Sequence, residues 1–181
     1  MGSSRGGVEL STEPAYGSGN PSDVSDLQSG RELRANWQWQ RLIILVFRGD
    51  PIDAPQYRHT SLFIEDLNQD GVATQHCVLE VVGSSGFFQR GEDAVRDPKE
   101  AATFVDSVVV ATIPVASPSD TRLRDAIWFT TVNNAEYSWN CQNWVGDALN
   151  SCISAGLVLA KEVDWAIDTM VDLILQAPYE A

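Results

Sequence analysis

The segment from Asn140 to Ile153 limits the possible folds of this chain more than any other stretch. Apolar residues recur along it at helical spacing and form one stripe: Cys141, Trp144, Val145, Ala148, Leu149, Cys152 and Ile153. A helix with such a stripe buries that face against another layer of structure. The pattern therefore predicts a helix, ending near Gly156, whose first residue, Cys141, faces the body of the protein.

The start of this helix also has chemical meaning. Asn140 precedes Cys141 and is a favourable N-cap residue. The N-terminus of a helix carries unpaired N–H groups and a partial positive charge, and both stabilise a thiolate. Cys141 is therefore a candidate nucleophile at neutral pH. The alternative is a structural role, because cysteine is often buried as a small apolar side chain.

Short apolar runs rich in β-branched residues lie before this helix and end at turn residues, which is typical of strands. They cover residues 41–47, 58–65, 75–82 and 104–115. Residues 83–100 are predicted to form loops and a short helix, and further helices are expected at about 120–130 and 162–176. The sequence predicts an α+β fold, with helices packed on an antiparallel sheet of about four strands.

The chain divides into two parts by composition. Residues 1–36 are rich in Gly, Ser and Pro and are predicted to be a disordered tail. Residues 37–181 are predicted to form a single α+β domain. The three cysteines lack the spacing of a disulfide framework, and no apolar run has the length of a membrane span. These features predict a cytoplasmic protein that does not enter a membrane.

Charge and spacing also argue against several kinds of ligand. The net charge of −13 argues against binding to nucleic acid or anionic lipid. The two histidines and three cysteines do not have zinc-site spacing, and no phosphate-binding loop is present, so neither a metal nor a cofactor is expected. The run Asp66–Gly71 resembles the start of a calcium loop, but Cys77 takes the place of the required acid, which favours a hairpin turn.

Acyl transfer at a thiol needs a base that works near neutral pH, and the chain offers His59 and His76. A turn centred near residues 68 and 69 would place His59 opposite Val78, with His76 and Glu80 as diagonal neighbours on one face. Either neighbour is able to orient the His59 ring. His76 is preferred, because a carboxylate there is more easily solvated. Both histidines also remain open to a structural role.

Two motifs carry a resemblance to a known superfamily. They are Arg58-His59-Thr60-Ser61-Leu62 and, much later, Asn140-Cys141-Gln142-Asn143-Trp144. Together they resemble the circularly permuted papain-like proteins, which include lecithin-retinol acyltransferase-like proteins, PPPDE (DeSI-type) isopeptidases and, as relatives, NlpC/P60 hydrolases. Uncharacterised fungal proteins have a similar His-then-Cys layout.

The resemblance implies roles for individual residues. Cys141 is implied as the nucleophile, His59 as the base and His76 as the third polar residue. The backbone N–H of Cys141 is implied as an oxyanion donor, with Gln142 or Asn140 as side-chain donors.

Two functions are consistent with these observations. The first is a thiol hydrolase that cleaves an amide, isopeptide or ester bond in a protein or small acyl substrate. The second is a catalytically inactive protein of the same fold, in which the acidic surface and the segment at Trp37, Gln38 and Trp39 bind a protein partner.

Overall fold

The computed structural model describes residues 38–115, 117 and 119–178. The predicted tail and Trp37 lie outside the described residues. The described part is α+β, as predicted, and its strands pair antiparallel in the order β4-β3-β2-β1-β5. The strands are β1 (Gln38–Phe47), β2 (His59–Leu67), β3 (Ala73–Val82), β4 (Gln89–Asp93) and β5 (Phe104–Val115). The helices are η1 (Pro55–Tyr57), η2 (Pro98–Glu100), α2 (Arg122–Trp128), α3 (Cys141–Ser154) and α4 (Ala160–Leu175).

The sheet has five strands among the described residues, one more than predicted. The additional strand is β4, which lies in the stretch predicted to form loops. Its sequence, Gln-Arg-Gly-Glu-Asp, has no apolar alternation, because β4 is an edge strand and most of its side chains are exposed. A short polar edge strand gives no periodic signal by which it can be recognised from sequence.

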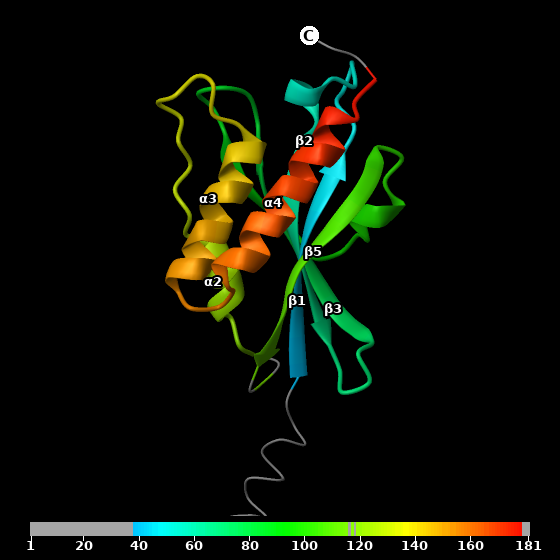
Figure 1. Cartoon of the computed structure of the whole chain (residues 1–181), viewed down its shortest axis with the longest axis vertical. Helices are drawn as coiled ribbons and strands as arrows, with labels where there is room; N and C mark the ends of the chain where they lie inside the picture. The colour runs from blue at the N-terminus through cyan, green and yellow to red at the C-terminus, as the bar shows by residue number, and fades with distance from the viewer. Residues whose placement is uncertain (1–37, 116, 118, 179–181) are drawn as a thin grey trace, which may run out of the picture. The chain divides into compact units, whose positions relative to one another are not determined.

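The long helices cover one face of the sheet. Figure 1 shows α3 and α4 side by side over the strands, where α3 packs mainly on β2 and α4 on β5. The predicted stripe of α3 is buried in this layer: Trp144, Val145, Ala148, Leu149 and Cys152. Gly156 follows the helix end with φ +69°, a backbone conformation that favours glycine after a helix. Within the described residues, no helix combines the length and apolar character needed to cross a membrane.

The opposite face of the sheet has a smaller apolar cluster. It is formed by Ile43, Leu45, Phe63 and Val78. The segment that contains η2 lies over this cluster. Lys99 Nζ sits 5.0 Å from the centre of the Phe63 ring and 2.9 Å from Glu65 Oε1. Successive residues of β2 therefore face different surroundings, with Leu62 and Ile64 toward the helices and Phe63 toward the η2 segment.

The β2–β3 hairpin differs from the predicted register. Leu67 pairs with Ala73, so the connection is longer than a turn centred on residues 68 and 69. Asn68 shapes this connection, because its Oδ1 accepts the backbone N–H of Val72 as well as that of Asp70. As a result, Val78 pairs with Phe63 rather than lying opposite His59 as predicted. The partner of Val78 is therefore four residues further along β2 than predicted, at residue 63 instead of residue 59.

Candidate active site

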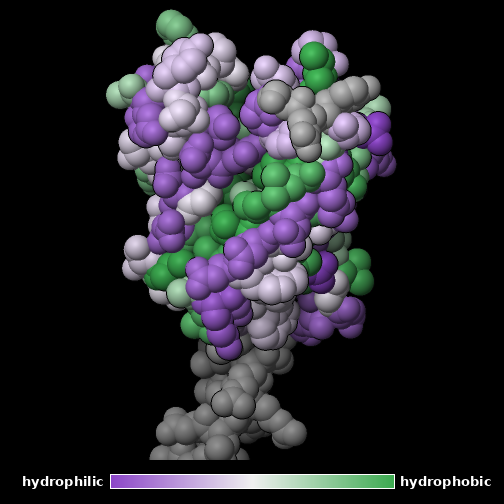
Figure 2. Space-filling model, turned by 45° about the horizontal axis from the view of Figure 1, so that its top comes forward, coloured by the Kyte–Doolittle hydropathy of each residue, from purple (hydrophilic) through white to green (hydrophobic). Residues whose placement is uncertain are grey.

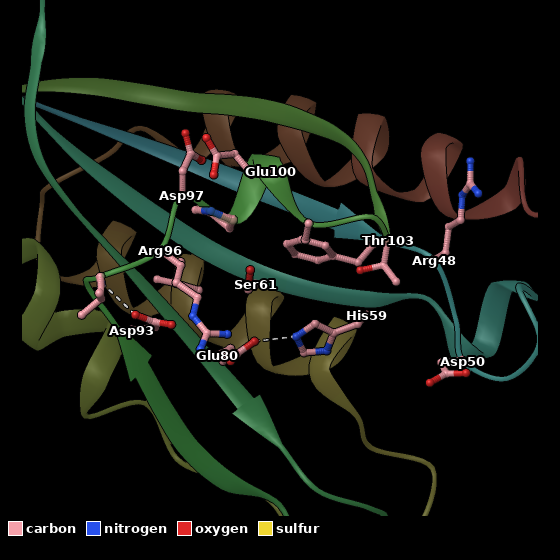
Figure 3. Close-up of a pocket in the computed structure, with 15 residues that line it drawn as sticks. Arg48, Asp50, His59, Ser61, Glu80, Asp93, Arg96, Asp97, Glu100 and Thr103 are labelled. Carbon is pink, nitrogen blue, oxygen red and sulfur yellow. Dashed lines mark hydrogen bonds and ion pairs between the residues drawn. The ribbon is translucent and has the colours of Figure 1, made fainter.

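His59 is the first residue of β2, and its ring is held by a carboxylate from β3. The Nε2 atom lies 2.7 Å from Oε2 of Glu80. Figure 3 shows the two side chains pointing toward each other from neighbouring strands. The His59 side chain is 32% exposed and that of Glu80 27%, so the pair is shielded but reachable from solvent. The ring of Phe47 lies beside His59, with the ring centres 5.9 Å apart.

Cys141 is the first residue of α3, and a capping box fixes its position. Asn140 Oδ1 accepts the backbone N–H groups of Gln142 and Asn143, and Asn143 Oδ1 accepts the N–H of Asn140. The backbone N–H of Cys141 has no acceptor among the described residues. That N–H is therefore free to bind an incoming oxygen, as expected for the first turn of a helix. Asn140 itself serves as the N-cap, as predicted for the helix start.

The thiol of Cys141 lies beside the start of β2. Its Sγ atom is 3.9 Å from the carbonyl oxygen of Arg58, the residue before His59. Burial by itself raises the pKa of the Cys141 thiol. A hydrogen bond to His59, the positive charge of that ring and groups of Thr60 outweigh burial, so the pKa of Cys141 lies below its ordinary value.

The opposite shift is found at His59. Burial by itself lowers the pKa of His59, but hydrogen bonds to Cys141 and Glu80 and their negative charges outweigh it and raise the pKa to about 10. A depressed thiol pKa together with a raised imidazole pKa favours a thiolate–imidazolium pair near neutral pH. The two shifts depend on each other, since each group supplies the charge that stabilises its partner.

Thr60 is a site residue that the sequence analysis missed. Its backbone N–H and hydroxyl both lower the pKa of Cys141. The hydroxyl is fully buried and has no partner at hydrogen-bond distance and angle within the part of the chain that the structure describes. Strand alternation was the signal available, because it places Thr60, the neighbour of His59, on the side of β2 that faces the helices.

Gln142 connects the helix of the nucleophile to the strand of the base. Its Nε2 donates to the carbonyl oxygens of Pro55 and Arg58, at 2.9 Å each. We call these two hydrogen bonds the Gln142 bridge. The prediction of Gln142 as an oxyanion donor does not fit this geometry, because both N–H bonds of its amide are already used. Gln142 instead holds the turn that leads into His59 next to Cys141.

Arg58 anchors the same turn from the other side. Its Nε and Nη2 atoms lie 2.9 Å from the two carboxylate oxygens of Asp53, a bidentate ion pair. Its Nη1 donates to the carbonyl oxygen of Leu173 in α4. The Arg58 side chain is only 5% exposed and that of Asp53 14%. Arg58 is therefore held through its side chain, which binds Asp53 and the Leu173 carbonyl, and through its own carbonyl, which accepts a hydrogen bond from Gln142.

His76 does not lie next to His59, so the prediction that His76 orients the His59 ring is wrong. His76 pairs with Glu65, far along β2 from His59. Its Nε2 lies 3.2 Å from the carbonyl oxygen of Arg96, and its ring packs near Phe63. The predicted hairpin was too short, which placed His76 too near the strand start. Glu80, the alternative neighbour from the sequence, is the residue that contacts His59.

This difference leads to a prediction for Glu80 and His76. We expect Glu80→Gln to slow alkylation of Cys141 by iodoacetamide at pH 6 by roughly fivefold, for a loss of about 1 kcal/mol. Without the carboxylate charge, the pKa of His59 falls and that of Cys141 rises. We expect His76→Gln to leave the pH–rate profile of Cys141 unchanged. Equal effects of the two substitutions on this profile would contradict the assignment of Glu80.

The other two cysteines have the opposite character. Burial, with the nearby charge of Glu92, raises the pKa of Cys77 to about 11. Burial alone raises the pKa of Cys152 to about 12. All three cysteines are free thiols. Cys77 and Cys152 are therefore internal references against which the reactivity of Cys141 can be measured.

A cavity of about 760 Å³ adjoins His59 on the face of the sheet away from α3 and α4. The η2 segment covers one side of it, as Figure 3 shows, and Glu80 and Ser61 project from the strands. Ser61 is fully buried, and its Oγ has no hydrogen-bond partner among the described residues. The cavity therefore presents the hydrogen-bonded His59–Glu80 pair to a bound molecule, with the Ser61 hydroxyl buried in its wall.

Comparison of the chain with models of protein families gave no match, and neither curated proteins nor solved structures matched it.

Proposed function

We propose that this protein is a cysteine-dependent hydrolase of amide, isopeptide or ester bonds with a permuted papain-like arrangement. The observation that carries the proposal is the His59 ring, which is hydrogen-bonded to Glu80 and coupled in its pKa to Cys141. A nucleophile, a base and a group that orients the base form the arrangement that covalent acyl transfer needs. Glu80 takes the third role that the sequence analysis gave to His76.

The first half of the reaction forms an acyl-enzyme. The Cys141 thiolate attacks the carbonyl carbon, a C–S bond forms, and the carbonyl π electrons move to the oxygen. The backbone N–H of Cys141 stabilises this oxyanion at the N-terminus of α3. Because Glu80 occupies Nε2 of His59, the proton passes from Nδ1 to the leaving amine or alcohol as its bond to carbon breaks.

The second half regenerates the thiolate. Neutral His59 accepts a proton from water, whose oxygen attacks the thioester carbon. The tetrahedral intermediate then collapses, the C–S bond breaks, and the carboxylic acid product leaves. Cys141 returns as the thiolate and His59 as the imidazolium. Glu80 hydrogen-bonds Nε2 of His59 and stabilises its imidazolium form, as the acidic member of a triad does.

The cavity beside His59 is lined by His59 and Glu80 but not by Cys141, so we assign it to a part of the substrate that lies beyond the base, away from the bond that is cleaved. Its volume of about 760 Å³ is within the range of small-molecule and peptide subsites. Phe47 and Val78 give it an apolar part, and Ser61 gives it a buried hydroxyl. A free thiol at the proposed centre also fits a reducing compartment, consistent with the expected cytoplasmic location.

The proposal is tested by the relative reactivity of the three thiols. At pH 6 we expect iodoacetamide to label Cys141 before Cys77 and Cys152, since only Cys141 has a lowered pKa. Peptide mass spectrometry of samples quenched over time gives the three rate constants. In the same preparation, 4-nitrophenyl acetate should release 4-nitrophenolate in a burst of about one per chain, which Cys141→Ser removes.

Two outcomes would contradict the proposal. One is labelling of Cys141 at the rate of an ordinary free thiol, which would mean that no thiolate–imidazolium pair forms. The other is ester cleavage that survives Cys141→Ser. Cys152→Ser is the matched control, because it makes the same chemical change on the same helix at a buried residue that the mechanism does not use.

A further inference from the structure

An apolar groove runs between α3 and α4, on the helical side of the molecule and away from the cavity beside His59. Its volume is about 510 Å³. Figure 2 shows it as a hydrophobic band bordered by hydrophilic side chains on both sides. The apolar residues that line it, which we call the groove floor, are Ile167, Met170, Val171, Ile174 and Leu175. Val171 is 41% exposed and Leu175 65%, so this surface is open to a partner.

Both banks of the groove are acidic or neutral. On α3, Asp147 is exposed between Asn143 and Asn150. On α4, Asp164, Asp168 and Asp172 are exposed and recur every four residues, so they follow one edge of the helix next to the floor. The sequences of α3 and α4 contain one basic residue, Lys161, at the far end of α4. Along the groove, therefore, α3 and α4 supply no basic side chain that would neutralise the carboxylates of the two banks.

We propose that the groove docks an amphipathic helix of a protein partner, with apolar residues on one face and Lys or Arg on its flanks. A helix fits because the floor residues recur over about two helical turns and present a straight apolar strip. Its basic flanks face Asp147 on one bank and the Asp164–Asp172 row on the other. The same charge argues against a second copy of this acidic surface, which would be repelled.

Charge and apolar contact contribute differently to such docking. Removal of the exposed floor from water supplies the affinity. The rim carboxylates are solvated, so each contributes little on its own but guides a cationic partner into register and speeds association. Binding is therefore expected to weaken as salt is added, and to depend on both the apolar face and the charge of the partner.

The groove ends at the Gln142 bridge. Pro55, Gln56 and Gln142 line that end, and they belong to the bridge or to the turn that precedes His59. A docked helix thus lies next to the residues that hold the proposed nucleophile and base together. The docking itself does not depend on the proposed chemistry. The docking is measured as peptide binding, so its test is independent of the test of the hydrolase proposal.

The test uses the full chain and three fluorescently labelled peptides. The first is about 18 residues long, with Leu at helical spacing and Lys elsewhere. The second keeps the Leu positions and replaces Lys by Glu. The third has the composition of the first in an order that destroys the apolar face. We expect fluorescence anisotropy to show saturable binding of the first peptide only.

Matched variants assign the binding to the groove. We expect the triple variant Asp164→Asn, Asp168→Asn and Asp172→Asn to bind the Leu/Lys peptide at least about fivefold more weakly. The double variant Val171→Ser and Leu175→Ser, at exposed positions that do not threaten the fold, should weaken it by a similar factor. The control carries the same charge change at exposed acids outside the groove: Asp70→Asn, Asp106→Asn and Glu136→Gln.

Several results would overturn the proposal. Equal binding of the scrambled peptide would mean non-specific charge attraction, and binding of the Glu peptide would remove the role of the acidic banks. An equal loss in the remote triple variant would place the effect outside the groove, as would undiminished binding by the groove variants. Concentration-dependent self-association that Val171→Ser and Leu175→Ser abolish would assign the groove to a second copy of this chain instead.

Discussion

His59→Ala should slow alkylation of Cys141 by iodoacetamide at pH 6 by about tenfold. An ordinary thiol with a pKa near 8.5 is only about 0.3% ionised at this pH. The His59 cation keeps the pKa of Cys141 low, so its removal reduces the thiolate fraction, while burial of the sulfur continues to raise the pKa. The effect is smaller than the change in ionisation, because a thiolate of higher pKa is also the better nucleophile.

The measurement is the full dependence of the alkylation rate on pH. In the wild type, the alkylation rate should already be high at pH 6. In His59→Ala, the rate should rise only as the pH approaches the pKa of an ordinary or buried thiol. His76→Ala is the matched control, because His76 contacts the Arg96 carbonyl and not the thiol. A profile for His59→Ala that superimposes on the wild type would exclude His59 as the partner of Cys141.

Arg58→Ala should reduce the free energy of unfolding by about 3 kcal/mol, since it leaves the Asp53 carboxylate without its buried partner. The carbonyl of Leu173 loses a donor at the same time. A hydrogen bond to Arg58 lowers the pKa of Asp53, with burial opposing it. The contribution of this pair is therefore present above the ordinary Asp pKa and disappears as the pH falls through the lowered value.

Urea denaturation at neutral and acidic pH measures this effect. We expect the difference between wild type and Arg58→Ala to be largest near pH 7 and to shrink in acid. Arg96→Ala is the control, because Arg96 is exposed and is not among the charges that shift the pKa of Asp53, and its loss should change stability by less than about 0.5 kcal/mol. A neutral result for Arg58→Ala would show that the ion pair does not stabilise the turn before His59.

The fold was largely predictable where apolar patterning is regular. The β5 run is bounded by turn residues, and its predicted limits agree with the structure; from Val108 onward its buried residues are interspersed with exposed ones. The helix at Cys141 was predictable for the same reason, through its stripe and its N-cap. β4 was missed because an exposed edge strand needs no apolar residues, and backbone pairing with β3 alone defines it.

The site was predictable only in part, because its members meet through long-range packing. The sequence identified Cys141 and His59 from local chemistry, and in the folded chain each of the two groups shifts the pKa of the other. The choice between His76 and Glu80 depended on the β2–β3 register, which a few extra loop residues change completely. The role of Gln142 was beyond local reasoning, because its acceptors lie 84 and 87 residues away in the chain.

Cys141 is far along the sequence from the residues that surround its thiol, and this has a practical consequence. The thiol contacts the carbonyl of Arg58, 83 residues earlier, so its environment exists only when the helical and β layers are assembled. Loss of tertiary structure would return the sulfur to the slow kinetics of a denatured thiol. In a sample that contains native and misfolded molecules, the amplitude of the rapid alkylation phase would then equal the native fraction, and one reagent would count correctly assembled protein.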